Sequence, residues 1–511
     1  MMGLAGPAEI REMLVGGDEV AILDLREEEI YSRSHPLFAA NLPLSRLELE
    51  ILDRVPRRDC PIILYDDEDG LTRPAASRLA DLGYSDVRVM SLKAWRAAGF
   101  ELFRDVNSAS KAFGELVEAK AHTRSLTAKE VKRLLDRGAD LVVLDARRFE
   151  EYRVMSIPSG VSVPGAELVL RAASLAPDPA TTIVVNCAGR TRSLIGAQSL
   201  KNAGLPNPVF ALRNGTIGWT LDGLGLDYGA ERRFGKIGGE RLAEARQRAR
   251  RVADRAGVKH IDDSGFATLP GTVYRFDVRD PDEYAAGHLP GFRSAPGGQL
   301  VQETDVFAPV RNAKIVLFDN LGVRADMTAS WLAQMGCDAM VLETDEPLSE
   351  RRSWKPSMAP LPPVELIDPD DVTPDHVLLD LGPSSTYRRG HVAGAHFIIR
   401  SRLEQDLPEE LARSGQLILV SSEDSLARFA AADLRARGIE AKVMSGGMSA
   451  WRPRPLESGR ERALSAFDDV YHRPYEGTDN PAAAMRAYLE WEYGLVTQLD
   501  RDGTHGFRVM V

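Results

Sequence analysis

The sequence contains only three cysteines, Cys60, Cys187 and Cys337, which are too few for a disulfide framework and fit a reducing compartment. It has no run of about 20 apolar residues that could cross a bilayer. Its N-terminus also lacks the basic end and the apolar stretch of a secretory signal peptide. These absences predict a cytoplasmic protein without a membrane-spanning segment.

Positive charge is not in excess either. The 64 Lys and Arg residues are outnumbered by 75 Asp and Glu residues, for a formal net charge of −11. This balance argues against binding to nucleic acid or to an anionic membrane. The spacing of His, Cys, Asp and Glu suggests no metal site, and we expect no cofactor. At 511 residues the chain is too long for one hydrophobic core, so its length suggests three or four domains.

The most informative stretch is a cysteine between a predicted strand and a predicted helix. A β-branched run over 183–185 leads to Cys187, and a helix that opens at Ser193 stops at Gly204. Backbone N–H groups and the helix dipole converge on such a turn and favour an anion. Because Arg190 and Arg192 add positive charge, we expect a lowered cysteine pKa and a thiolate. A buried structural cysteine, the alternative, does not require two flanking arginines.

Residues 187–192, Cys-Ala-Gly-Arg-Thr-Arg, resemble the active-site loop of the rhodanese sulfurtransferases. In that family a nucleophilic cysteine opens a six-residue loop on an α/β domain. The related phosphatases and arsenate reductases need five residues between the Cys and an Arg, and here that Arg position is Ser193. The loop is therefore one residue too short for phosphate chemistry.

The pattern around Cys187 occurs four times along the chain. In each repeat a strand ends at an Asp, and a second strand, a loop and a helix that stops at Gly follow. The Asp residues and the first loop residues form the pairs Asp24 and Asp66, Asp145 and Cys187, Asp277 and Asp319, and Asp380 and Ser421. The two members of a pair are 42 residues apart in three repeats and 41 apart in the fourth. This repetition predicts a tandem array of similar domains.

The resemblance implies an α/β fold of four tandem rhodanese-like domains, each a mostly parallel sheet flanked by helices. The predicted domains are 1–115, 116–236 with Cys187, 237–355 and 356–458, followed by a C-terminal helical tail over 459–511. In such sheets the loops lie at the carboxyl ends of the strands, where ligands bind. We expect linkers in the charged helical stretch 238–255 and in the Pro-rich stretch 356–363.

The segment 459–511 departs from the repeat and is rich in aromatic residues, with one predicted helix. Aromatic residues at this density usually pack onto another surface. Two interpretations stay open. The segment docks on a neighbouring domain or subunit, or it covers the active site as a lid.

The resemblance also implies sulfur transfer through a persulfide on Cys187. The thiolate attacks the outer sulfur of a small anionic donor such as thiosulfate, sulfite leaves, and a thiophilic acceptor then removes the sulfur. No general base is needed if the thiolate already exists. Arg190 and Arg192 are expected to hold the sulfonate of the donor. The loop residues expected to bind the sulfur and the donor are Ala188, Gly189, Arg190, Thr191, Arg192 and Ser193.

Asp145 and Arg147, at the end of the first strand of this domain, are expected to form an ion pair that supports the loop. Direct contact with the donor is the alternative. The same Asp-x-Arg pattern occurs in the first and third repeats, whose loops lack a cysteine, which favours the structural interpretation.

The other three loops do not fit this chemistry. The loop at Asp66 carries four carboxylates, which repel an anionic donor. Because these carboxylates also repel one another, we expect Asp66→Ala to stabilise the protein slightly. The loop at Asp319 keeps an arginine, Arg324, but has no good nucleophile. The loop at Ser421 has hydroxyls without a base or an Arg. We interpret these three domains as structural or docking modules.

We therefore predict a sulfurtransferase that moves sulfur from thiosulfate to cyanide or to a thiol acceptor, which a protein or a small molecule provides. The two loop arginines favour thiosulfate, with 3-mercaptopyruvate as the alternative donor. A persulfide relay, and a scaffold or sulfide sensor without enzymatic activity, remain alternatives. The sequence leaves the oligomeric state open, a homodimer included.

Overall fold

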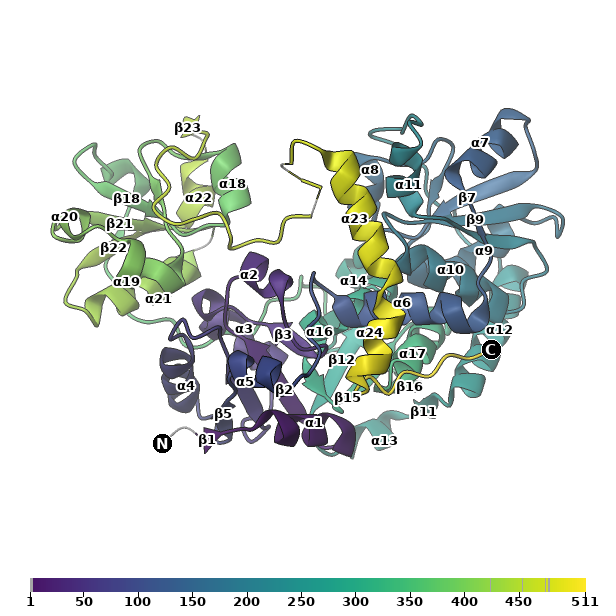
Figure 1. The fold of residues 1–511 in the computed structure, drawn as a ribbon, viewed down its shortest axis with the longest axis horizontal. Helices are drawn as coiled ribbons and strands as arrows, with labels where there is room; N and C mark the ends of the chain where they lie inside the picture. Colours follow the sequence, from purple (N-terminus) through teal and green to yellow (C-terminus); the bar gives the residue numbers. More distant parts are fainter. Residues whose placement is uncertain (1–2, 423, 453, 474, 477) are drawn as a thin grey trace. The chain divides into compact units, whose positions relative to one another are not determined.

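The structure, a computed structural model, describes residues 3–422, 424–452, 454–473, 475–476 and 478–511. Among them the chain forms four parallel sheets, each covered by helices, as the repeat predicts (Figure 1). No helix of these residues has the length and apolar character that a bilayer crossing requires.

The sheet of the second repeat carries Cys187. Its parallel strands lie in the order β6 (Ser125–Leu126), β10 (Val209–Leu212), β9 (Thr182–Asn186), β7 (Leu141–Asp145) and β8 (Val161–Ser162). The helices are α7 (Ala128–Asp136), α8 (Phe149–Val154), α9 (Leu168–Leu175), α10 (Thr191–Asn202) and α11 (Gly215–Leu221), with the 3-10 turn η2 at Gly165–Glu167. The central strand β9 is apolar and buried on both faces, as is typical of parallel sheets covered by helices.

The sheets of the other repeats have the same order. The first has β1 (Gly3–Leu4), β5 (Val87–Val89), β4 (Ile62–Tyr65), β2 (Val20–Asp24) and β3 (Ala39–Asn41). The third has β11 (Lys259–Ile261), β16 (Asp338–Leu342), β15 (Lys314–Phe318), β12 (Val273–Asp277) and β13 (Arg293–Ser294). The fourth has β17 (Leu366–Ile367), β22 (Ala441–Met444), β21 (Leu417–Val420), β18 (Val377–Asp380) and β20 (His396–Phe397).

The helix after each loop ends at a glycine in the left-handed region of backbone space. These helices are α4 (Thr72–Asp81), α10, α17 (Arg324–Gln334) and α21 (Asp424–Arg435). The terminating residues are Gly83, Gly204, Gly336 and Gly438, with φ values of +86°, +70°, +77° and +77°. Because residues with a Cβ rarely adopt this conformation, the glycines reliably marked the ends of the four helices.

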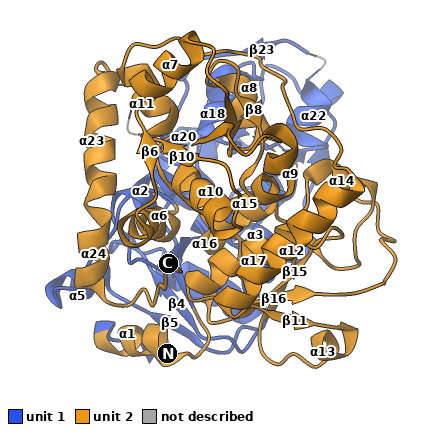
Figure 2. Ribbon diagram, turned by 90° about the vertical axis from the view of Figure 1, so that its right-hand side faces the viewer, with its two compact units in different colours: residues 1–7, 21–106, 356–472 blue, residues 8–20, 107–355, 473–511 orange. Residues whose placement is uncertain are grey.

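The chain divides into two compact units (Figure 2). Residues 1–7, 21–106 and 356–472 form one unit, so the first and fourth repeats pair. Residues 8–20, 107–355 and 473–511 form the other, which pairs the second repeat with the third. Within the first unit, Arg400 of the fourth repeat donates to both carboxylate oxygens of Glu48, each at 2.8 Å.

The two predicted linkers differ in structure. The stretch 356–363 has no helix or strand, as expected. The charged stretch is a helix, α12 (Gly239–Ala256), but it is more than a linker because its apolar face joins the core of the second repeat through Ala245, Ala249 and Val252. It also packs against α17 of the third repeat.

The C-terminal segment has two helices instead of the single one expected, α23 (Pro481–Tyr493) and α24 (Leu495–Asp502). Both pack against α6 (Ser108–Ala121), as Figure 1 shows. The residues before α23 contribute to the other unit, where the ring of Phe467 lies 5.0 Å from that of Phe397. One tail segment thus contributes to both units.

Candidate active site

Cys187 lies directly after β9, at the carboxyl ends of the parallel strands, and only 2% of it is exposed. The helix α10 begins at Thr191, two residues earlier than the sequence predicted. The loop therefore turns from strand to helix in four residues, 187–190, and the first N–H groups of α10 lie close to the cysteine.

The segment that begins α11 fixes the loop from one side. The backbone N–H of Thr216 donates to the carbonyl oxygen of Cys187, and that of Ile217 donates to Ala188, each at 3.0 Å. Gly215 allows this close approach, because a Cβ there would lie 2.3 Å from the carbonyl oxygen of Cys187. Its φ of +52° also favours glycine.

Asp145 and Arg147 form the expected ion pair beside the loop. The Nε and a terminal nitrogen of Arg147 donate to the two carboxylate oxygens of Asp145, at 2.9 and 2.7 Å. Asn186, the last residue of β9, donates to the same carboxylate at 2.7 Å. Arg147 also donates to the carbonyl of Met155 at 2.6 Å. These contacts connect β7, β9 and the segment after α8.

Arg190 has a different position from the one expected, because it points to α6. All three of its guanidinium nitrogens are hydrogen bonded. Nε and Nη2 donate to the carboxylate of Glu115 at 2.7 and 2.8 Å, Nη2 also bonds Glu118, and Nη1 donates to Asn214 at 3.1 Å. The ring of Tyr493 lies 4.2 Å from the guanidinium carbon. With 3% exposure, Arg190 connects the loop to its surroundings.

The helix α6 was not expected to take part in the site, because the predicted boundary divided it between two domains. Its Gly114 packs directly on the start of α10, where a Cβ would lie 2.9 Å from the methyl carbon of Thr191. This close approach brings Glu115 to Arg190. A glycine inside a helix, followed by a carboxylate on the apolar face, is the local signal that the sequence offered.

Arg192, unlike Arg190, acts on the ionisation of the Cys187 thiol. Two of its guanidinium nitrogens donate to the two oxygens of Glu151 at 2.7 and 2.9 Å. Although burial opposes the ionisation of Glu151, Arg192 and the neighbouring Arg147 and Arg148 lower its pKa to about 2. The positive charge of Arg192 in turn favours the thiolate of Cys187.

The thiol of Cys187 is not the pre-formed thiolate that the sequence predicted. Burial raises its pKa above the ordinary value, and this effect exceeds the opposing effects of Arg192 and of the hydroxyl and backbone N–H of Ser193. The nearby carboxyl of Glu492 raises the pKa further. The prediction of a lowered pKa is therefore wrong, because burial outweighs the charge of Arg192. Arg190 and Arg192 are also both paired with carboxylates.

The C-terminal helix α23 packs on α6 and α11, as the docking interpretation expects, and it also covers the loop at Gly189, as the lid interpretation expects. Glu492 is 1% exposed, and its Oε2 lies 3.4 Å from where a Cβ of residue 189 would be. Gly189 therefore makes room for this carboxyl. The hydroxyl of Tyr493 donates to Asn214 at 3.0 Å, which joins α23 to the segment that holds the loop. The sequence had not indicated Glu492 or Tyr493 as site residues.

A family model described as a rhodanese-like domain matches the chain four times, over residues 6–98, 127–222, 268–345 and 364–453. The chain belongs to the rhodanese-like family. Each match contains one of the four principal sheets or most of its strands, which confirms the predicted tandem architecture.

Solved structures include a full-length relative of this rhodanese-like chain. A thiosulfate sulfurtransferase from Pseudomonas aeruginosa is 55% identical, with a TM-score of 0.97 and 100% of each chain covered. The Alr3790 protein from Anabaena sp. is 23% identical over 20% of this chain and 93% of its own, with a TM-score of 0.18. A protein of unknown function from Rhodopseudomonas palustris is 27% identical over 22% and 91%, with a TM-score of 0.20. No curated protein matched the chain.

The rhodanese-like loops of the first and third repeats hold a carboxylate in place of the thiol. Asp66 accepts hydrogen bonds from the backbone N–H groups of Glu68, Leu71 and Thr72 at 3.0, 2.6 and 3.3 Å. Asp319 accepts from those of Leu321, Val323 and Arg324 at 2.9, 2.8 and 2.6 Å. Oriented N–H groups of this kind bind anions. The loop of this fold is therefore an anion site in two repeats that lack the cysteine.

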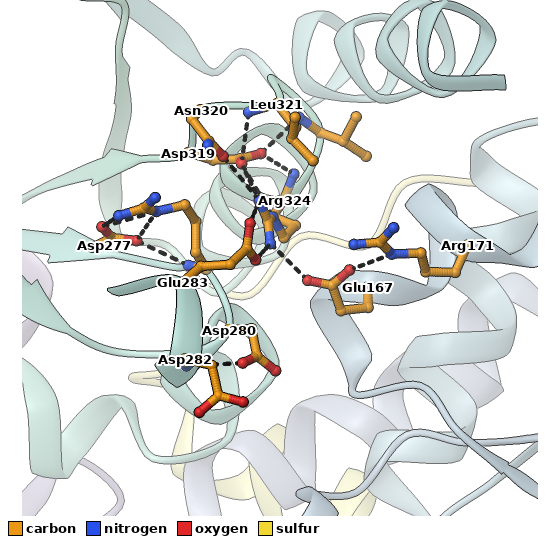
Figure 3. A network of polar contacts seen from close by, with 12 residues as sticks. Glu167, Arg171, Asp277, Asp280, Asp282, Glu283, Asp319, Asn320, Leu321 and Arg324 are labelled. Carbon is orange, nitrogen blue, oxygen red and sulfur yellow. Dashed lines mark hydrogen bonds and ion pairs between the residues drawn. The ribbon is translucent and has the colours of Figure 1, made fainter. Parts of the chain in front are cut away.

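The third rhodanese-like loop also keeps its arginine, which is fully buried (Figure 3). Arg324 donates to Asp319 of its own loop and to Glu167 of the second repeat at 2.8 Å, and it also bonds Glu283. Glu167 in turn accepts from Arg171 at 2.8 Å. A network of alternating charge thus joins the two repeats of this unit.

The fourth rhodanese-like loop begins with a hydroxyl, that of Ser421, at the position of the thiol. The backbone N–H of Ala427 donates to the hydroxyl of Ser421 at 3.3 Å. Residue 423, inside the predicted loop 421–426, lies outside the described residues. Throughout the described part of the chain, no group of three or more His, Cys, Asp or Glu side chains is placed to hold a metal ion.

Proposed function

We propose that this rhodanese-like protein is a sulfurtransferase that takes sulfane sulfur from thiosulfate and carries it as a persulfide on Cys187. The observation that carries the proposal is the position of that thiol. It occupies the place in which two sister loops bind a carboxylate through backbone N–H groups. The full-length similarity to a thiosulfate sulfurtransferase supports the choice of donor.

The first half-reaction is a displacement at the outer sulfur of the donor. The thiol of Cys187 loses its proton to solvent while the site is open, and the resulting thiolate attacks that sulfur. A new S–S bond forms, and the S–S bond of thiosulfate breaks. Sulfite leaves with the electron pair of the broken bond, and the persulfide carries a negative charge. Because thiolate and persulfide are both anionic, the N–H groups of residues 188–193 favour both states.

The second half-reaction restores the thiolate. A thiophilic acceptor attacks the outer sulfur of the persulfide, and the electron pair of the S–S bond returns to Cys187. Cyanide gives thiocyanate, and a thiolate gives a new persulfide. A thiol of a small molecule or of a protein is thus a suitable acceptor. The three free cysteines support a reducing, cytoplasmic location.

The loop side chains have two different roles in this proposal. Arg192 and Ser193 act on the sulfur directly, because both favour the anionic form of Cys187. Arg190 holds the loop in shape through Glu115 and Asn214. Cys187 is 2% exposed, and α23 lies against Gly189 of its loop, so we expect the donor to enter when this helix moves.

The proposal is tested by incubating the protein with thiosulfate and measuring the mass of each cysteine peptide. We expect one additional sulfur atom on the peptide with Cys187 and steady formation of thiocyanate when cyanide is added. Cys187→Ser should abolish both. Cys60→Ser and Cys337→Ser are the matched controls and should keep both. Sulfur on another cysteine, or thiocyanate formation by Cys187→Ser, would contradict the proposal.

Parallel kinetics with 3-mercaptopyruvate identify the donor. If kcat/KM is higher with this compound than with thiosulfate, 3-mercaptopyruvate is the donor. The persulfide on Cys187 remains part of the proposal in that case. Absence of persulfide with either donor would leave the sensor or scaffold interpretation.

A further inference from the structure

The lid helix α23 brings a buried carboxyl to the loop, and half of this carboxyl has no partner. Oε1 of Glu492 accepts a hydrogen bond from the hydroxyl of Tyr488 at 3.1 Å. Oε2 makes no hydrogen bond with the described residues, although it is buried. It faces Gly189, at 3.4 Å from the Cβ position of that residue. A buried polar atom without a partner is rare and costly, and a functional role is one explanation for it.

The charges around Glu492 come from two elements. From α6, Lys111 favours the ionised carboxylate, whereas Glu115 opposes it. From the loop, Arg190 favours ionisation, and the thiol of Cys187 lies near enough for Glu492 to raise its pKa. Burial outweighs all these effects and raises the pKa of Glu492 to about 8. At neutral pH the side chain is therefore mostly a carboxylic acid, with one O–H to donate.

We propose that Glu492, as a neutral acid, donates a hydrogen bond from its free oxygen to the anionic sulfur held by the loop, so that the lid completes the active site. The inference rests on the proposed sulfurtransferase function. The O–H stays on Glu492 throughout, and no proton is transferred. The backbone N–H groups donate to the anionic sulfur from the loop itself, and Glu492 adds one further donor from α23. The ionised form would instead repel thiosulfate and the persulfide.

The test compares Glu492→Gln with Glu492→Ala. Gln keeps the size and an N–H donor, whereas Ala removes both. At pH 7 we expect kcat/KM with thiosulfate to fall about ten- to a hundredfold in Glu492→Ala, as for a lost hydrogen bond to a charged group. Glu492→Gln should stay within roughly threefold of wild type. Glu490→Gln, at an exposed position of the same helix, is the matched control and should not differ from wild type.

The pH profile separates this role from a purely structural one. Ionisation of the Cys187 thiol, whose pKa burial raises, makes kcat/KM increase with pH. In wild type, loss of the Glu492 proton above about pH 8 should oppose this increase. The amide of Glu492→Gln does not ionise, so the ratio of kcat/KM in Glu492→Gln to that in wild type should rise above about pH 8, while the ratio for Glu490→Gln stays constant. A ratio for Glu492→Gln that stays constant with pH would overturn the inference. A Glu492→Gln variant as inactive as Glu492→Ala would also overturn it, because that outcome indicates a general base.

Alkylation of Cys187 by iodoacetamide gives a readout that needs no sulfur donor. Because ionised Glu492 raises the pKa of the thiol, Glu492→Gln should shift the alkylation profile to lower pH, and Glu490→Gln should not. An unchanged profile would show that Glu492 does not reach the thiol. Failure of wild type to form any persulfide would instead refute the proposed function, so the two failures are distinguishable.

Discussion

The carboxylate of Asp319 accepts a hydrogen bond from the backbone N–H of Arg324 at 2.6 Å. The corresponding residues of the second repeat, 132 positions earlier, are Cys187 and Arg192. The arginines of both repeats also pair with a glutamate 41 residues before them, Glu283 and Glu151. This arginine–glutamate pair therefore does not depend on the cysteine, since it persists in the third repeat, where Asp319 replaces Cys187.

We expect Asp319→Ala to destabilise the protein. Although burial opposes it, Arg324 and three backbone N–H groups hold the pKa of Asp319 below its ordinary value. Removal of this charge leaves a buried arginine with one partner fewer and costs about 3–5 kcal/mol. Chemical denaturation measures the loss. Asp345→Ala, at an exposed position, is the control, and equal stability of the two variants would contradict the prediction.

Asp66→Ala should also destabilise, in contrast to the slight stabilisation expected from the sequence. Its carboxylate satisfies three backbone N–H groups that lose their partner on substitution, at a cost of about 1–3 kcal/mol. Asp69 is the useful comparison, because burial and the neighbouring Asp66 and Asp67 raise its pKa. Relief of that repulsion should make Asp69→Ala neutral or slightly stabilising in the same denaturation experiment.

Glu151 makes stability depend on pH. Its pKa of about 2 in the folded protein lies below its ordinary value of 4.5, so its contribution is present above about pH 4.5 and is lost as the pH falls towards 2. The full contribution is about 3 kcal/mol. Glu151→Gln should flatten the stability profile over this interval, as measured by thermal unfolding, whereas the exposed Glu150→Gln should not.

Glu151→Gln should also make Cys187 more reactive. Without its carboxylate partner, the charge of Arg192 acts more strongly on the thiol and lowers the thiol pKa. Alkylation at pH 7 should become about three- to tenfold faster. A slower reaction would mean that Glu151 acts mainly by positioning Arg192.

Substitution of Glu115, the partner of Arg190, tests the role of this arginine. If Arg190 holds the loop in shape, Glu115→Ala and Arg190→Ala should both lower kcat/KM with thiosulfate about ten- to a hundredfold. Arg190→Lys should not restore activity, because a lysine cannot form the paired contacts of the guanidinium. If Arg190 instead held the donor, Glu115→Ala would release it and leave activity unchanged. Lys120→Ala, at an exposed position of α6, is the control.

Asp319→Cys, made in a Cys187→Ser background, tests whether the shape of the loop is sufficient for sulfur transfer. The variant supplies a thiol beside Arg324, but Gly322 stands at the position of Arg190. Arg324 is also bonded to Glu167 and Glu283. We expect alkylation of the new thiol with little persulfide from thiosulfate. Efficient sulfur transfer would show that the cation at the Arg190 position is dispensable.

The fold was predictable because its signals are local and repeated. The spacing from Asp145 to Cys187, the Asp-x-Arg pairs and the glycines after each helix depend on residues close in sequence, and the structure contains each of them. The position of Cys187, directly after its strand and before a helix, was predictable for the same reason.

The environment of Cys187 was not predictable, because it depends on distant segments. Glu115 lies 75 residues before Arg190, and Glu492 lies some 300 residues after Cys187. No periodicity of the sequence indicates that α6 and α23 cover this loop. The expected low thiol pKa failed mainly because the sequence does not show how deeply these segments bury the thiol. The carboxylates that pair with Arg190 and Arg192 were not foreseen either.

The place of α23 in the chain has a consequence for protein synthesis. A ribosome adds about 5–20 residues per second, so Glu492 is made roughly 15–60 s after Cys187. During this interval the nascent chain can fold the second repeat, but its thiol has no cover. Oxidants and electrophiles thus meet a more accessible cysteine on the nascent chain than on the finished enzyme.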